Sequence, residues 1–256
     1  VLYDFCDYHQ GMVLVTGSTG TVKSTTLAAM INHINETRNL NIISLEDPIE
    51  FVHPSKKCQV IQRELGTHLT SFADGVRSAM REDPDVILVG ELRDAETISM
   101  AMTAAETGHL VLGTLHTTGA VKTIDRIIDA LPGELREQTK GFLAMSLKAV
   151  VTQVLCKTPD GRGRSAVLEI LVNTRAIAKL ITTDQTHQIP SQIQTGKHLG
   201  MQQLDQALLE AIQRKEVDPD DAFRFANDKR KFSRFVADTD LVRTLDTGAT
   251  GSFASE

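Results

Sequence analysis

The first half of the chain alternates short apolar runs with segments of helical periodicity. Four runs scarcely alternate with polar residues, which is typical of strands buried on both faces of a sheet: 12–15 (MVLV), 42–45 (IISL), 86–90 (VILVG) and 110–115 (LVLGTL). Between them, apolar residues recur at helical spacing, namely Leu27, Met30, Ile31, Ile34 and Ile98, Ala101, Met102, Ala105. A further helix is predicted from the capping residue Ser71 towards Arg81. Strands that alternate with helices over short links predict an α/β domain with a mainly parallel sheet flanked by helices.

The second half of the chain has a different pattern. Residues 134–157 are predicted to form one long helix, because apolar residues cluster on one side of it. A strand is expected over 166–172 (AVLEILV), followed by helices at 174–182, 201–215 and 219–227. We therefore expect a core over 1–157, a mostly helical C-terminal region over 158–240 packed on it, and a disordered polar tail over 241–256.

Composition narrows the class of protein. The 256 residues hold 27 Lys and Arg against 33 Asp and Glu, a net charge of −6, which disfavours a general nucleic-acid binder. No apolar run reaches the roughly 18–20 residues that span a membrane, so no transmembrane segment is expected. Residues 1–10 lack the charged and apolar segments of a signal peptide. Cys6, Cys58 and Cys156 form no C-x-x-C pair, which predicts buried thiols in a reducing compartment and no structural zinc.

Residues 13–30 (VLVTGSTGTVKSTTLAAM) predict a buried strand, a tight turn and a helix. This segment nearly matches G-x-x-x-x-G-K-[ST], in which main-chain N–H groups and a helix N-terminus hold phosphate oxygens. The expected nucleotide-binding residues are Gly17, Ser18, Thr19, Gly20, Thr21, Val22, Lys23, Ser24 and Thr25. In that pattern Lys23 reaches the β- and γ-phosphates of ATP and Ser24 holds Mg²⁺.

Val22 departs from this pattern, because it stands where the pattern has glycine. A β-branched residue at positive φ is strained by about 1–3 kcal/mol, which predicts a distorted loop that binds phosphate more weakly. The alternative is that Lys23 merely lies near a helix start after an ordinary turn.

Carboxylates follow the apolar run at 42–45. Glu46, Asp47 and Glu50 lie where the strand is expected to end, at the edge of an open α/β sheet that binds ligands. Carboxylates at that edge hold Mg²⁺ directly or through water. The alternative is a solvated acidic turn set by Pro48.

A carboxylate also follows the run at 86–90. Glu91 is placed to orient or deprotonate an attacking water, since it comes directly after a predicted strand near the phosphate-binding segment. Arg81 and Arg93 are candidates for contacts to a γ-phosphate, in the same subunit or in a neighbouring one. Ordinary surface pairing with acidic neighbours such as Asp94 remains open for both arginines.

A histidine follows the run at 110–115. His116 is placed to sense a γ-phosphate or to relay a subunit movement, whereas His109 precedes the run and is as readily structural.

The order of these motifs resembles the secretion ATPase superfamily, and most closely the type IV pilus retraction ATPases of the PilT and PilU type. The four motifs are GSTGTVKSTT (17–26), EDPIEFVH (46–53), DPDVILVGELRD (83–94) and AETGHLVLGTLHTTGAVKTIDR (105–126). They resemble the family's Walker A, Asp box, Walker B and His box, in that order. The segment QIQTGKHLGMQQLD (192–205) also resembles a segment of the family, so the similarity runs from about residue 11 to 205.

The resemblance implies a RecA-like P-loop ATPase core that binds ATP and Mg²⁺. Glu91 would be the Walker B glutamate, Glu46 and Glu50 the Asp-box residues and His116, with His109, the His box. Ser24, Glu46 and Glu91 would hold Mg²⁺, and three arginines would make inter-subunit contacts: Arg81, Arg93 and Arg126. The family's biology is a cytoplasmic hexameric motor at the inner face of the bacterial inner membrane. It acts on a pilus platform protein and can work together with a second retraction ATPase. It couples ATP hydrolysis to pilus disassembly and twitching motility.

Three departures from the family pattern keep alternatives open. Walker A has Ser18 for proline and Val22 for glycine, and the family's AIRNLI helix reads AIAKLI at 176–181. The family's N-terminal PAS-like domain is expected ahead of residue 1 and is missing from this sequence. The alternatives are a weakly or non-hydrolysing ring subunit and a pilus-assembly or type II secretion ATPase. A DNA-translocating ATPase is disfavoured by the low net basicity.

Overall fold

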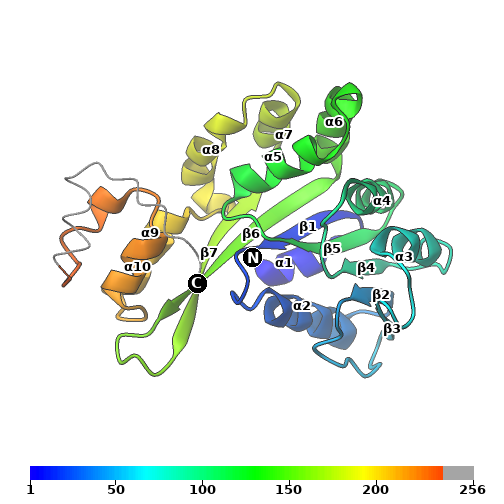
Figure 1. The fold of residues 1–256 in the computed structure, drawn as a ribbon, viewed down its shortest axis with the longest axis horizontal. Helices are drawn as coiled ribbons and strands as arrows, with labels where there is room; N and C mark the ends of the chain where they lie inside the picture. The colour runs from blue at the N-terminus through cyan, green and yellow to red at the C-terminus, as the bar shows by residue number, and fades with distance from the viewer. Residues whose placement is uncertain (239–256) are drawn as a thin grey trace. The chain divides into compact units, whose positions relative to one another are not determined.

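A computed structural model of the chain describes residues 1–238, so the expected tail at 241–256 lies outside the described residues. The strands are β1 Gly11–Thr16, β2 Asn41–Glu46, β3 Gln59–Glu64, β4 Val86–Val89, β5 Leu110–Leu115, β6 Leu147–Lys157 and β7 Arg164–Val172. They form a seven-stranded sheet in the order β3-β2-β4-β5-β1-β6-β7 (Figure 1). Strands β1 to β6 pair in parallel with their neighbours in this order, so the predicted α/β fold with a mainly parallel sheet is confirmed.

Helices connect the strands in the order expected of such a sheet. They are α1 Leu2–Cys6, α2 Lys23–Thr37, α3 Phe72–Ala79, α4 Ala95–Glu106, α5 Ala120–Ala130, α6 Arg136–Ser146, α7 Arg175–Thr182, α8 Ile189–Thr195, α9 Leu204–Gln213 and α10 Pro219–Phe225. Short 3₁₀ turns lie at Gly133–Leu135, Thr186–Gln188, Gly196–Leu199 and Lys229–Lys231. In the part of the chain that the structure describes, none of these helices is long and apolar enough to span a bilayer.

Alternate residues of the central strands are buried against helices on the two sides of the sheet. Met12 and Leu14 of β1 belong to the apolar core formed with α3, α4, α5, α6 and α7. Figure 1 shows α1 and α2 on the other side of the strands, where the predicted stripe of α2 from Leu27 to Ile34 is buried. Because the strands are covered on both sides, they read as continuous apolar runs in the sequence.

Two parts of the sequence-based prediction are wrong. The long helix expected at 134–157 ends at Ser146, and Leu147 begins the eleven-residue strand β6. Its valines fit a helical spacing, but they are buried because β6 lies inside the sheet beside β1. Strand β3 was not predicted, since its residues are only partly buried and largely polar.

The described chain divides into two compact units. Unit 1 comprises Val1–Gln153 and Glu169–Gln202, and unit 2 comprises Val154–Leu168 and the residues from Gln203 onward. This differs from the expected boundary at 157, because α7 and α8 bury Ile177, Ile181 and Ile189 in the core of unit 1. Unit 2 has its own apolar core, built on α9, α10 and the β6–β7 hairpin. The three cysteines are free and buried, as predicted.

Candidate functional site

Residues 17–22, here called the glycine loop, leave the carboxyl end of β1 and lead into α2. The loop is closed by the main-chain N–H and hydroxyl of Thr21, which donate to Ser18 O at 3.3 and 2.8 Å. Gly17 has a φ of 146°, and a Cβ there would lie 2.6 Å from the Thr21 hydroxyl, so only glycine fits. Gly20 has a φ of 80° and faces open space. The loop therefore has the strand–turn–helix geometry that the phosphate-binding pattern requires.

Val22 adopts the left-handed conformation that the pattern assigns to glycine. Its φ is 57° and its ψ is 37°, as expected for this position but unusual for a β-branched residue. The side chain is 42% exposed and makes no capping hydrogen bond to α2. Contacts of the Val22 side chain therefore offset little of the backbone strain, which is about 1–3 kcal/mol.

Lys23, the first residue of α2, lies against the glycine loop. Its side chain is only 9% exposed, and Nζ donates to Gly17 O at 2.9 Å and to Ser18 O at 3.2 Å. Nζ also lies 3.4 Å from Nδ1 of His116. Burial lowers the pKa of Lys23, and the charge of Glu91 acts in the opposite direction. The ammonium group is thus held where the loop closes, within reach of the end of β5.

Glu91 follows β4 and pairs with groups from two neighbouring segments. Its Oε2 lies 2.6 Å from Nη2 of Arg93, and its Oε1 lies 3.2 Å from Nε2 of His116. Burial raises the pKa of Glu91, but the hydrogen bonds and charges of Arg93 and His116 outweigh it, so the net pKa is lowered. The His116 ring thus lies between the two groups, with Nε2 towards Glu91 and Nδ1 towards Lys23.

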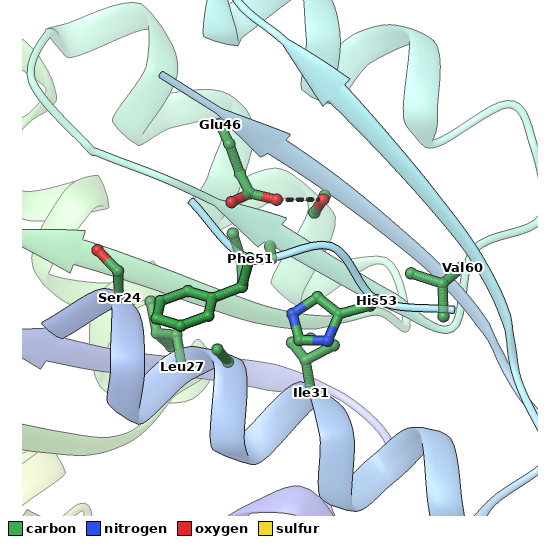
Figure 2. Close-up of a pocket in the computed structure, with 10 residues that line it drawn as sticks. Ser24, Leu27, Ile31, Glu46, Phe51, His53 and Val60 are labelled. Atoms are coloured by element: carbon green, nitrogen blue, oxygen red, sulfur yellow. Dashed lines mark hydrogen bonds between the residues drawn. The ribbon is translucent and has the colours of Figure 1, made fainter. Parts of the chain in front are cut away.

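A small pocket beside α2 brings Ser24 and Glu46 together. Figure 2 shows Glu46 at the end of β2 and Ser24 in the first turn of α2, and the ring of Phe51 lies beside Ser24 and below the Glu46 carboxylate; all three residues line the pocket. Oε1 of Glu46 accepts from Ser44 Oγ at 2.7 Å and from Gln62 Nε2 at 3.0 Å. Within residues 1–238 no hydrogen bond to Oε2 is recorded, so this oxygen can accept from water or bind a cation.

These donors fit Mg²⁺ bound mainly by water and phosphate. A hydroxyl and a carboxylate oxygen are hard ligands, and Mg²⁺ in nucleotide sites keeps several waters and takes only one or two protein groups. Residues 1–238 contain no cluster of three or more His, Cys, Asp or Glu suited to a metal. Glu91, also expected as a ligand, pairs with Arg93 and His116 in this structure, and its role towards Mg²⁺ stays a prediction.

Some predicted residues are not brought to this edge of the sheet. Arg81 and His109 precede β4 and β5, so both lie at the opposite, amino edge. His109 Nδ1 lies 2.9 Å from Ala104 O, a structural contact at the end of α4. Glu50 is exposed in the loop after β2. Arg126 does line the same hollow as Glu91, although it makes no ion pair among the described residues.

Gln153 is a residue at the glycine loop that the sequence analysis missed. It lies on β6, is 1% exposed, and its amide contacts Thr21 O and the Thr26 hydroxyl. The signal was a single polar amide within the β-branched run AVVTQV at 149–154, which the helix prediction obscured.

Comparison with known proteins places this geometry in a family. Residues 2–219 match the family described as type II/IV secretion system protein. A twitching motility protein of Neisseria gonorrhoeae is 55% identical over 224 residues, which are 88% of this chain and 60% of that protein. The type IV pilus retraction ATPase PilT of Pseudomonas aeruginosa is 55% identical over 202 residues, 79% of this chain and 58% of that protein.

A solved structure agrees with the sequence matches. The crystal structure of the pilus retraction motor PilT with bound ADP matches with a TM-score of 0.84 and 42% identity, covering 91% of this chain and 66% of that one. The chain spans about three fifths of the length of the curated relatives it matches.

Proposed function

Because the chain belongs to the family of type II/IV secretion system proteins, we propose that it is the ATP-hydrolysing part of a pilus retraction motor. The observation that carries the proposal is the convergence of Lys23, His116 and Glu91 beside the glycine loop, from three separate strand ends. The relatives named for twitching motility and pilus retraction support pilus disassembly as the work that hydrolysis drives.

The proposed roles follow from the contacts of each group. The glycine loop and the N-terminus of α2 bind the phosphates, and Lys23 exchanges its loop carbonyls for phosphate oxygens. Glu91 is ionised near neutral pH, since Arg93 and His116 lower its pKa, and it can accept a proton from the attacking water. Mg²⁺, held by Ser24 and through water by Glu46, supplies charge neutralisation of the phosphates.

Assembly is also part of the proposal. A hexameric ring at the inner face of the inner membrane would place a neighbour's arginine near the nucleotide, and exposed Arg81, Arg93 and Arg126 are the candidates. Its partners would be a pilus platform protein and a second retraction ATPase. One relative, 42% identical, is named the type IV pilus ATPase PilU of Pseudomonas aeruginosa.

Two substitutions separate binding from hydrolysis. Glu91→Gln keeps the shape but removes the base, so ATP turnover should fall at least about a hundredfold while ATP·Mg²⁺ affinity stays within about threefold. Lys23→Ala removes the phosphate contact and should weaken affinity itself. Turnover by malachite-green assay and affinity by calorimetric titration check both, and unchanged turnover in Glu91→Gln would refute the role of Glu91.

Controls come from exposed residues away from the loop. Glu106→Gln, at the end of α4, and Lys57→Ala, ahead of β3, make the same chemical changes and should leave both readouts unchanged.

A second candidate function rests on Val22. Its left-handed backbone favours a ring subunit that binds nucleotide weakly or does not hydrolyse it. In that case the unsubstituted chain would turn over ATP no faster than Glu91→Gln, whereas Val22→Gly would gain activity.

A further inference from the structure

Gln153 contacts the glycine loop at both of its ends. Its main-chain oxygen lies so near Gly17 that a Cβ there would come within 2.4 Å of it. Its side-chain Nε2 donates to Thr21 O, the carbonyl directly before Val22. Its Oε1 accepts from the Thr26 hydroxyl, in the first turn of α2, at 2.8 Å. The amide is buried and both of its polar atoms are satisfied, so its position is fixed.

These contacts lie on both sides of Val22, the residue with the strained backbone. The peptide between Thr21 and Val22 carries the carbonyl that Gln153 holds, and Thr26 is the residue whose N–H donates to Val22 O at 3.3 Å. A strained dihedral persists only where surrounding contacts over-determine it. The exposed Val22 side chain supplies few such contacts, whereas Gln153 holds the main-chain carbonyl of Thr21 directly before Val22 and the side-chain hydroxyl of Thr26 after it.

We propose that Gln153 is a positioning residue that holds the glycine loop in its phosphate-binding conformation in spite of valine at position 22. With glycine at position 22, the left-handed conformation carries no Cβ penalty and needs no such support. The need for the Gln153 contact is therefore specific to chains that, like this one, have a β-branched residue there.

The consequence for ligand binding rests on the proposed function. Without the Gln153 amide, Val22 can relax to an ordinary dihedral, and the fraction of chains with a competent loop falls. The apparent affinity for nucleotide falls by the same fraction. A side chain that acted on the phosphates directly would instead matter equally whichever residue occupies position 22.

A double-mutant cycle on the 256-residue chain tests this coupling. Gln153→Met keeps the length of the side chain and removes the amide. We expect it to raise the dissociation constant for ATP·Mg²⁺ about tenfold in the Val22 chain and no more than about twofold in Val22→Gly. KM should rise more than kcat falls, because the loss is one of loop population.

Amide hydrogen exchange over residues 13–30 gives a second readout that needs no nucleotide. Gln153→Met should speed exchange in this segment, and the increase should be several times smaller in the Val22→Gly background. If neither the unsubstituted chain nor Val22→Gly binds ATP, the proposed function fails, while the exchange data still decide the role of Gln153.

Asn173→Leu is the matched control. The Asn173 amide also holds the main chain, since it donates to Ala144 O at 2.9 Å and to Leu147 O at 2.8 Å, away from the glycine loop. It should leave nucleotide affinity and exchange at 13–30 unchanged. The proposal is overturned if Gln153→Met has no effect on exchange, if its effects are equal in both backgrounds, or if Asn173→Leu reproduces them.

Discussion

At the scale of single residues, the charge of Glu91 depends on groups from separate segments. Arg93 comes two residues later and His116 from the end of β5, while Lys23 and Arg126 are the other cations around it. The lowered pKa stabilises the folded state above the ordinary value of 4.5, and this contribution is lost as the pH falls through the folded-state pKa.

Arg93→Ala tests whether Arg93 lowers the pKa of Glu91. Removing the guanidinium leaves burial opposed by His116 alone, so the pKa of Glu91 should rise, as read by carboxyl ¹³C NMR titration. Arg93 is largely exposed, so the cost in unfolding free energy should be only about 0.5 kcal/mol at neutral pH and should vanish as the pH falls through the lowered pKa of Glu91. Arg126→Ala, which removes a cation from the same hollow without breaking an ion pair, should shift the pKa less. A fall in the Glu91 pKa in Arg93→Ala would contradict this account.

At the scale of elements, two helices begin with side-chain caps of different chemistry. Asp94 caps α4 by accepting from the N–H and the hydroxyl of Thr97, both at 2.8 Å. Ser71 caps α3 by accepting from Asp74 N at 3.1 Å, as the sequence predicted. Asp94 is thus occupied by its own helix, and among residues 1–238 it forms no ion pair with an arginine.

The two caps should differ in their pH dependence. Asp94→Ala and Ser71→Ala should each cost about 1 kcal/mol of unfolding free energy at neutral pH, measured with urea. Burial raises the pKa of Asp94, but the Thr97 hydrogen bonds outweigh it, so its contribution is present above 3.8 and is lost as the pH falls through the lowered pKa. The cost of Asp94→Ala should therefore shrink as the pH falls through the lowered pKa of Asp94 while that of Ser71→Ala stays constant, and parallel pH profiles would argue against the assignment.

Whether a strand can be predicted from the sequence depends on how its burial sets the order of apolar and polar residues. Strands β1, β2, β4 and β5 are buried on both faces and were found as apolar runs, and their ends placed Lys23, Glu91 and His116 correctly at one edge. Strand β6 was misread because a fully buried strand has no period of two to distinguish it from a helix. That error hid Gln153, whose partners are 127 or more residues away along the chain.

At the scale of the whole molecule, each of the two units of the described chain has an apolar core of its own. The core of unit 1 fills the sheet and its helices, whereas unit 2 buries Phe223, Phe232 and Leu208 around α9 and α10. Phe223 is 1% exposed, and Lys229 Nζ lies 5.3 Å from the centre of its ring. A substitution in the core of one unit is therefore expected to destabilise that unit and not the other.

Paired truncations decide whether the units unfold separately. Phe223→Ala should cost about 3–5 kcal/mol, because it leaves a cavity in a small core, and it should raise amide exchange in α9 while α2 stays protected. Ile34→Ala, which truncates a fully buried residue of α2, should do the reverse at about 2–5 kcal/mol. Hydrogen exchange by mass spectrometry reads both segments in one experiment. If either substitution exposes both helices equally, the two cores form one cooperative unit. Separate responses would mean that motion of unit 2 need not disturb the glycine loop, whose own strain is held within unit 1 by Gln153.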